Sequence, residues 1–384
     1  MARGPRYVFF TNECVGLGHL RRTFALARAT ADHRPSTSAL VVTGSAAVSG
    51  YPLPPRVDTV KLPVLARDGH GLHSARTLAV GLDDIHRVRS GIAVGAVDAF
   101  EPDVVVVDKT PLGLNGELMP VLDRLREMGS RVVLGLRDID DSQEAVMRAW
   151  SGRLTIDAIR HYYDAVLVYG PESGIDALAC LGVDDLGIPV HHVGYVGTAV
   201  PEQLPTDLPD GYMLITPGGG ADGFALLRDV VAAMRMSPLP CPAVMVTGPL
   251  MPERQVRALR DLAQGLPLTI HVFRADMEAV IAGARCIVAM AGYNTVSELI
   301  GTGRPALLAP RGGPSGEQLV RAESLAARGA VDLLRPEHRT PATLRAAIGR
   351  LLNDRAPMAP VVHDGAARAA RILSRLAEPA LAAA

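Results

Sequence analysis

The chain has 384 residues, 48% hydrophobic and 21% charged, which predicts a soluble protein of two or three globular domains. Its net charge of −1 excludes a general attraction to nucleic acid or acidic membranes. No apolar run approaches the roughly 18–20 residues of a membrane-spanning helix, and residues 1–10 lack a signal-peptide core. The four cysteines are scattered without a Cys-x-x-Cys pair, which favours a reducing compartment, so we expect a cytoplasmic protein.

Short apolar runs rich in β-branched residues alternate with helical patterns along almost the whole chain. Such continuous apolar strands separated by helices favour parallel sheets that are covered on both faces. Twelve strands are too many for one compact sheet of this chain length. The predicted strands are Tyr7–Thr11, Ala39–Thr43, Asp103–Val107, Arg131–Leu136, Ala165–Tyr169, Val190–Val193, Tyr212–Thr216, Ala243–Thr247, Leu268–Phe273, Cys286–Met290, Ala306–Leu308 and Ala330–Leu333.

The pattern breaks where Pro201, Pro205 and Pro209 stand among acidic residues without a helical period, which indicates an extended linker. We therefore expect an α/β protein with two Rossmann-like domains whose parallel sheets face each other across a cleft. The predicted parts are residues 1–197, a linker at 198–209, a second domain at 210–365 and a terminal helix at 366–384 that packs back on the first domain.

A glycine turn, Gly16-Leu17-Gly18-His19, follows the first predicted strand. Arg21 stands where a dinucleotide fingerprint needs its third glycine, which argues against a nicotinamide or flavin site. His19 is a candidate general base at the strand end, or else a residue that packs the turn. Asp108 ends another strand, where it either orients His19 or caps the next helix.

Arg137 and Asp138 follow the strand at residues 131–136. The sequence Asp138-Ile139-Asp140 resembles the Asp-x-Asp that some sugar transferases use to hold a divalent metal. The adjacent Arg137 favours an ion pair over a metal, so we assign Arg137 and Asp138 to recognition of the acceptor.

Two loops of the second half follow strands and precede helices. Gly218, Gly219 and Gly220 form a turn that lets the backbone approach a phosphate. The turn lacks the Gly-Lys-Ser/Thr ending of a P-loop, so ATP hydrolysis is not expected. Further on, Phe273 and Arg274 lie where a loop can contact a flat ring or a phosphate.

The most informative stretch runs from the strand Cys286–Met290 through Gly292 into a helix that starts near Asn294 and Thr295. A helix N-terminus offers unpaired N–H groups and a partial positive charge, so it is an anion site. Glu298, one turn in, would repel a phosphate, but its carboxylate can accept hydrogen bonds from sugar hydroxyls. A phosphate beside a ribose indicates a nucleotide.

The motifs of the second half, in this order and spacing, resemble the two-domain GT-B glycosyltransferases, and family 28 in particular. They are Phe273-Arg274-x-Asp276-Met277, Ala291-Gly292-x-Asn294-Thr295-x-x-Glu298, Gly303-x-Pro305-Ala306-Leu307-x-x-Pro310 and Glu317-Gln318-x-x-Arg321-Ala322. The likeness covers residues 268–330, and the Gly-x-Gly-His turn and the triple glycine extend it weakly.

This resemblance implies that Glu298 binds the ribose and that the amides from Gly292 to Thr295, with the triple-glycine turn, hold the diphosphate. It also implies base contacts from Phe273 and Arg274 and donor-sugar contacts from Glu317 and Gln318. The turn at Gly18 and His19 would, by the same resemblance, meet the acceptor and the reaction centre. The reaction would need neither a metal nor another cofactor.

We expect an inverting sugar transfer from a nucleotide diphosphate, most simply a uridine one, to a hydroxyl or amine. The first half lacks the Gly-Gly-x-Gly-Gly-His pattern of the peptidoglycan-precursor enzymes, so an acceptor from secondary metabolism or a cell-surface glycan is expected instead. A nucleotide-sugar hydrolase or epimerase, and a non-catalytic nucleotide-sugar binder, stay open as alternatives. Peripheral membrane contact and a homodimer stay open too.

Overall fold

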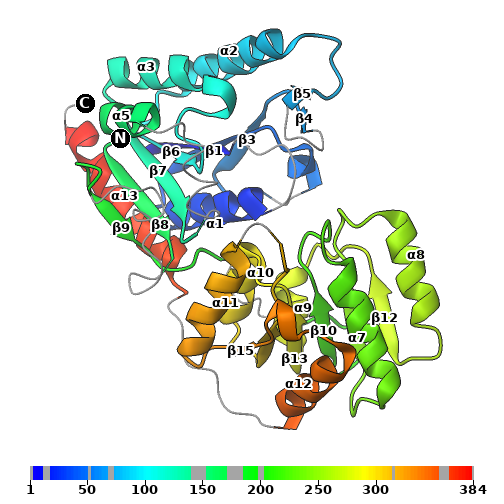
Figure 1. The fold of residues 1–384 in the computed structure, drawn as a ribbon. Helices are drawn as coiled ribbons and strands as arrows, with labels where there is room; N and C mark the ends of the chain where they lie inside the picture. The colour runs from blue at the N-terminus through cyan, green and yellow to red at the C-terminus, as the bar shows by residue number, and fades with distance from the viewer. Residues whose placement is uncertain are drawn as a thin grey trace. The chain divides into compact units, whose positions relative to one another are not determined.

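The structure is a computed structural model that describes residues 3–11, 18–50, 53–67, 73–139, 153–170, 185–197, 203–313, 316–353 and 363–382. The chain forms two compact units (Figure 1). The first unit contains Met1–Val196 and Asp364–Ala384, and the second contains Gly197–His363. The chain therefore leaves the first unit once and returns to it for its last helix.

The first unit is built on a seven-stranded sheet in which all the neighbouring strands run parallel. The strand order is β3-β2-β1-β6-β7-β8-β9. Because the strands are parallel, their carboxyl ends lie at one edge of the sheet. The strands are β1 (Arg6–Thr11), β2 (Ser38–Thr43), β3 (Val57–Lys61), β6 (Val104–Asp108), β7 (Arg131–Arg137), β8 (Ala165–Tyr169) and β9 (Val190–His192). A separate antiparallel pair joins β4 (Leu65–Arg67) and β5 (His73–Ala75).

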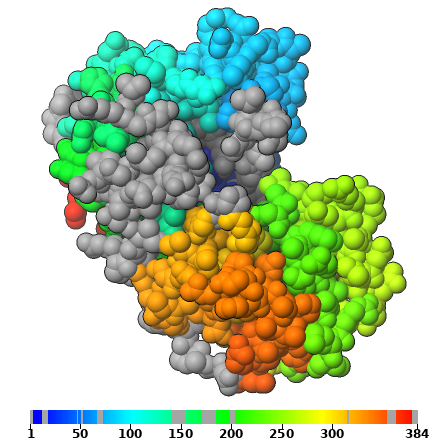
Figure 2. All heavy atoms as spheres, viewed as in Figure 1, coloured from blue at the N-terminus to red at the C-terminus, as the bar shows by residue number. Residues whose placement is uncertain are grey.

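Helices cover both faces of this sheet, so its central strands are buried on both sides. On one face lie α2 (Leu82–Phe100), α3 (Met119–Met128) and α5 (Arg153–Tyr162), whose apolar side chains form one core with the strands. On the other face, α1 (Gly18–His33) packs against α13 (Gly365–Ala382). Both α2 and α3 reach the surface of the unit in the space-filling view (Figure 2).

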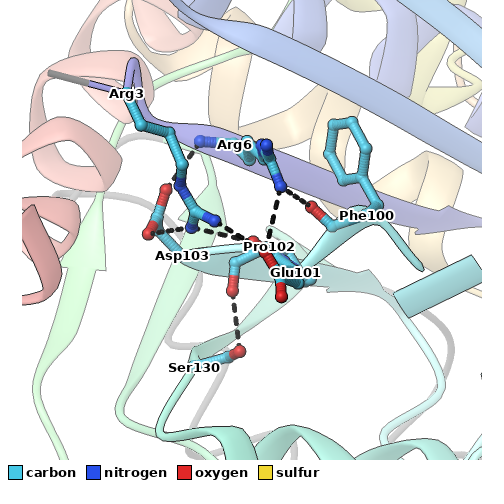
Figure 3. A network of polar contacts seen from close by, with 7 residues as sticks. All are labelled: Arg3, Arg6, Phe100, Glu101, Pro102, Asp103 and Ser130. Carbon is cyan, nitrogen blue, oxygen red and sulfur yellow. Dashed lines mark hydrogen bonds and ion pairs between the residues drawn. The ribbon is translucent and has the colours of Figure 1, made fainter. Parts of the chain in front are cut away.

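Polar contacts tie β1 to β6 at the amino ends of these strands (Figure 3). Arg3 donates to Asp103 at 3.0 Å and to Glu101 at 3.0 Å, and the backbone N–H of Arg6 donates to Asp103 at 2.7 Å. Glu101 ends α2 in the left-handed region with a φ of 46°. In such folds ligands bind at the carboxyl ends of the strands. The network therefore stabilises the edge of the sheet that lies opposite to the ligand-binding edge.

The second unit has a six-stranded parallel sheet in the order β12-β11-β10-β13-β14-β15. The helices α7, α8 and α12 pack on one face of it around an apolar core. No helix in the described part of the chain is long and apolar enough to cross a bilayer. The elements are β10 (Met213–Thr216), β11 (Ala243–Val246), β12 (Leu268–His271), β13 (Cys286–Ala289), β14 (Ala306–Leu308), β15 (Asp332–Leu333), α7 (Phe224–Met236), α8 (Glu253–Leu262), α9 (Met277–Gly283), α10 (Tyr293–Ile300), α11 (Glu317–Ala327) and α12 (Pro341–Asn353), and three 3-10 turns lie at Ala46–Gly50, Leu114–Gly116 and Pro336–His338.

The predicted fold class, an α/β protein with two Rossmann-like parallel sheets, is confirmed. Each of the twelve predicted strands is present with ends that differ by two residues or fewer. The strand β3 was not predicted, because Val57–Lys61 is short, lies between prolines and is polar at three of its five positions. It pairs with β2 at the margin of the sheet, where one side of a strand needs no neighbour.

A buried ion pair holds the loops after β2 and β3 in the first unit. Arg89 on α2 donates to both carboxylate oxygens of Glu117, at 2.6 and 2.8 Å, and to the carbonyl of Pro63 at 2.6 Å. Both side chains are almost wholly buried. A Cβ on Gly44, just after β2, would lie 2.8 Å from the Arg89 guanidinium, so this position needs glycine.

We expect Arg89→Met to lower the free energy of unfolding by about 3–5 kcal/mol, because it leaves the Glu117 carboxylate buried without its cation. Urea unfolding measures the change. The double variant Arg89→Met/Glu117→Gln should recover part of the loss. Arg124→Met, which removes an exposed ion pair with Asp98 between α2 and α3, is the matched control and should change stability little. A loss in R89M no larger than in the control would show that the buried pair contributes nothing.

Candidate functional site

In the first unit, His19 and Asp108 meet at the carboxyl edge of the sheet. His19 lies in the first turn of α1, which follows β1, and Asp108 is the last residue of the neighbouring β6. His19 Nδ1 is hydrogen-bonded to Asp108 Oδ2, and both side chains are buried. The structure therefore brings together the two residues that the sequence singled out as a candidate base and its partner.

Arg22, three residues after His19 on α1, completes this cluster. Its Nη2 lies 2.8 Å from each oxygen of Asp108, and its Nε lies 3.2 Å from Oδ1. The two hydrogens of Nη2 are thus directed at the carboxylate, although Nη2 also lies 2.9 Å from His19 Nδ1. We therefore assign the hydrogen of the bond between His19 Nδ1 and Asp108 Oδ2 to the imidazole, so that Nδ1–H donates to the carboxylate. In this tautomer the lone pair of the imidazole lies on Nε2.

The charge of Asp108 is held by its two neighbours. Burial raises the pKa of Asp108, but the charges of Arg22 and then His19, with their hydrogen bonds, lower it by more. The net pKa lies well below the ordinary value for a carboxyl group, so Asp108 is ionised at neutral pH. An ionised carboxylate only accepts hydrogen bonds, which agrees with the tautomer assigned to His19.

An aromatic ring supports Arg22 on another side. The Arg22 guanidinium lies over the ring of Tyr169, 5.2 Å from its centroid. Tyr169 ends β8, and the ring reaches Arg22 across Gly135 on the intervening strand β7. A Cβ at position 135 would overlap the Tyr169 ring, so glycine makes this stack possible.

The residues assigned to the acceptor lie near the same edge but differ in exposure. Gly18 begins α1, and Arg137 is half-buried at the end of β7. Asp138 is buried, where it accepts hydrogen bonds from the Tyr195 hydroxyl at 3.0 Å and from the Ile139 N–H at 2.7 Å. Its carboxylate thus has a local structural role. Gly16 and Asp140 lie outside the described residues.

In the second unit, the triple-glycine turn lies against the start of α10. Gly218 and Gly220 have positive φ values of 83° and 97°. A Cβ on Gly218 would lie 2.7 Å from Thr295 Oγ1, and a Cβ on Gly220 would overlap the Thr247 carbonyl. The glycines therefore let this turn approach the start of the helix. As a result, Gly218 and Thr295, which are 77 positions apart in the sequence, lie next to each other.

The helix α10 has the features of an anion site. Gly292 is its N-cap and supplies no side-chain hydrogen bond to the first turn. Asn294 and Glu298 are half-buried on the helix. Arg321, buried on α11, donates to the carbonyl of Ala291 at 3.0 Å and so adds a positive charge close to the helix start.

The loop between β12 and α9 carries the residues predicted to meet the nucleobase. Phe273 is 46% exposed, so its ring is open to solvent. Arg274 is instead bound by Asp207 and by Asp276, to which its Nη2 donates at 2.7 Å. The hydrogen bonds with Arg274 lower the pKa of both carboxyl groups. Phe273 is therefore the better candidate for stacking on a flat ring.

Glu317 and Gln318 begin α11 close to the loop after β14. Arg311 Nη2 donates to Glu317 Oε1 at 2.6 Å, and the Arg311 N–H donates to Gln318 Oε1 at 3.2 Å. In the part of the chain that the structure describes, no group of three or more His, Cys, Asp or Glu side chains is arranged to hold a metal ion. Independence from a metal stays a prediction.

Arg22 and Arg311 were not predicted from the sequence. Arg22 follows His19 by three residues, so the two side chains share a helix face, and this spacing was a usable signal. Arg311 comes just after a predicted strand, the place where ligand-binding groups gather in parallel sheets. Their carboxylate partners lie 86 and 89 positions away along the chain and depend on strand order, which the sequence analysis did not predict.

Comparisons with known proteins give a match to one family model and to a set of similar proteins. Residues 219–375 match the family model described as glycosyltransferase family 28 C-terminal domain. A curated relative from Novosphingobium aromaticivorans is 28% identical over 297 residues, which are 76% of this chain and 70% of the relative. It is named UDP-N-acetylglucosamine--N-acetylmuramyl-(pentapeptide) pyrophosphoryl-undecaprenol N-acetylglucosamine transferase.

Two solved structures share the fold over nearly their full length. MurG of Acinetobacter baumannii has a TM-score of 0.55 and 18% identity, with 98% of this chain and 99% of that chain covered. The calicheamicin glycosyltransferase CalG4 has a TM-score of 0.58 and 17% identity, with 99% and 97% covered. Both are GT-B structures, so the GT-B fold is confirmed.

We expect Gly135→Ala to lower the free energy of unfolding by about 1–3 kcal/mol, because the new methyl group displaces the Tyr169 ring that supports Arg22. Gly95→Ala on the exposed face of α2, where nothing lies within 4 Å, is the matched control and should be neutral or stabilising. Urea unfolding compares the two variants. Equal stabilities would show that Tyr169 tolerates a side chain at position 135.

Proposed function

We propose that this chain is a glycosyltransferase that transfers a sugar, with inversion, from a nucleotide diphosphate to a hydroxyl or amine acceptor. The match of residues 219–375 to the family 28 C-terminal domain and the GT-B fold support this proposal. The observation that carries the proposal is the meeting of the triple-glycine turn with the N-terminus of α10, one turn before Glu298. This arrangement suits a diphosphate beside a ribose. The name of the curated relative supports a uridine donor.

In the donor site, the diphosphate accepts hydrogen bonds from the first N–H groups of α10 and from the glycine turn. The helix dipole favours the negative charge that grows on the leaving diphosphate, so it stabilises the transition state without a metal. Glu298 accepts hydrogen bonds from the ribose hydroxyls, and Phe273 stacks on the base. The exposure of Phe273 supports this role.

On the acceptor side, His19 acts as the general base. The acceptor oxygen or nitrogen attacks the anomeric carbon, its proton moves to His19 Nε2, and the bond from that carbon to the diphosphate oxygen breaks. Asp108 holds the tautomer and offsets the positive charge of the imidazolium that forms, while Arg22 fixes Asp108. One displacement of this kind inverts the anomeric centre.

We expect Glu298→Ala to weaken the binding of UDP by about tenfold or more, because hydrogen bonds to a charged acceptor contribute about 1.5–3 kcal/mol. Titration calorimetry measures the dissociation constant. Glu253→Ala on the exposed surface of α8 is the control and should leave it unchanged. Unchanged affinity in E298A would remove Glu298 from the ribose site.

We expect His19→Ala to lower kcat by about a hundredfold or more, while UDP affinity stays near the wild-type value, since the base acts on the acceptor. His33→Ala, at the exposed end of α1, is the matched control and should be fully active. Turnover is followed as release of UDP with a panel of acceptors and without one. A loss of only a few-fold would assign the base to another group, and rapid release of free sugar without any acceptor would favour a hydrolase.

A further inference from the structure

Arg311 joins two carboxylates that come from different parts of the second unit. Its Nη1 donates to Asp222 Oδ2 at 2.6 Å, and its Nη2 donates to Glu317 Oε1 at 2.6 Å. We call these three residues the Arg311 bridge. Asp222 lies in the loop after β10, Arg311 follows β14, and Glu317 begins α11.

The strand order places the Arg311 bridge next to the start of α10. β10 and β14 are the two neighbours of β13, and β13 leads directly into the turn at Gly292 and then into α10. The ion pair between Arg311 and Asp222 therefore connects the loops on both sides of the strand that delivers the proposed diphosphate site. A donor whose diphosphate lies at α10 would bring its sugar close to this bridge.

Within the bridge, one oxygen of Glu317 has no partner among the residues that the structure describes. Its side chain is 11% exposed, and Oε1 is occupied by Arg311. Oε2 is buried and has no hydrogen-bond partner among the described residues. A buried carboxylate oxygen without a donor is costly, and an ionised carboxylate can only accept. The oxygen is thus suited to an O–H or N–H group from a ligand.

The Arg311 bridge also has a net charge. One guanidinium and two carboxylates leave a single negative charge, because Asp222 and Glu317 together outweigh Arg311. Burial lowers the pKa of Arg311, but its contacts with Asp222 and Glu317 raise it by more, so the guanidinium stays charged. A third carboxylate, brought in by a ligand, would therefore meet like charge in a partly buried place.

We propose that the Arg311 bridge determines which class of donor sugar binds. Arg311 is a positioning residue that holds Glu317 so that Oε2 accepts a hydrogen bond from a hydroxyl or amide N–H of a neutral hexose. The net negative charge of the bridge disfavours uronic acid donors. This inference rests on the proposed donor site and adds to it the role of Arg311 and the neutral class of the sugar.

The test compares the dissociation constants of UDP, UDP-glucose, UDP-N-acetylglucosamine and UDP-glucuronic acid by titration calorimetry, with the corresponding thymidine compounds as a second series. We expect the wild-type protein to bind at least one neutral sugar nucleotide more tightly than the free nucleotide, and at least tenfold more tightly than the uronate. Arg311→Met should weaken the binding of the neutral sugar nucleotide by about tenfold, which removes most of the affinity that the sugar adds. The affinity for the free nucleotide should change less than threefold. Retained nucleotide binding shows that the variant is folded.

Three further variants separate charge from position. Arg311→Lys keeps the cation and should restore part of the gain from the sugar. Glu317→Gln removes a negative charge and should narrow the difference between neutral and uronate donors. Arg257→Met, which breaks an exposed ion pair with Glu253 on α8 of the same unit, is the matched control and should behave as the wild-type protein.

The possible results have distinct meanings. If the wild-type protein binds neither nucleotide series, the proposed function is wrong. If it binds the free nucleotide but gains nothing from any neutral hexose, or binds the uronate as well as the hexoses, the inference about the Arg311 bridge is overturned while the donor site stands. Equal weakening of nucleotide and sugar nucleotide in R311M would also overturn it, since Arg311 would then serve the diphosphate.

Discussion

Both candidate sites depend on the parallel register of the strands. In each sheet the carboxyl ends lie at one edge, so the loops that follow different strands meet there although they are far apart in the chain. His19 meets Asp108 because β1 pairs with β6, and the triple-glycine turn meets Thr295 because β10 pairs with β13. The chemistry at each site comes from a few side chains, but their meeting is a property of strand order.

Arginine–carboxylate pairs make these meeting points rigid. Arg22 binds Asp108, and Arg311 joins Asp222 to Glu317. In both cases the carboxylate keeps a further acceptor role beside its arginine. Asp108 also accepts a hydrogen bond from His19, and Glu317 has a buried oxygen with no donor among the residues that the structure describes. A planar guanidinium with several donors can fix a carboxylate in this way, whereas a lysine holds it at one point only.

Much of the fold could be predicted from the sequence, because continuous apolar strands and glycine turns have strong local signals. The strand β3 had a weaker signal: its polar residues and flanking prolines hide a strand that pairs on one side only. Within the candidate sites, His19, Asp108 and Glu298 could be singled out as candidates because each follows a strand or lies near the start of a helix. The arginines Arg22 and Arg311 were not predicted, since an ion pair such as Arg311–Asp222 joins positions with no local relation.

The sequence by itself determined the alternation of strands and helices, the places where glycine allows close approach, and the candidate anion site at the start of α10. These are local properties of consecutive residues. Only the tertiary structure decided that Arg274 is occupied by two carboxylates, that Asp138 is buried against Tyr195, and that Arg22 stacks on Tyr169 across Gly135. The physical reason is that burial and ion pairing depend on which strands become neighbours, and that order is set by packing over the whole unit.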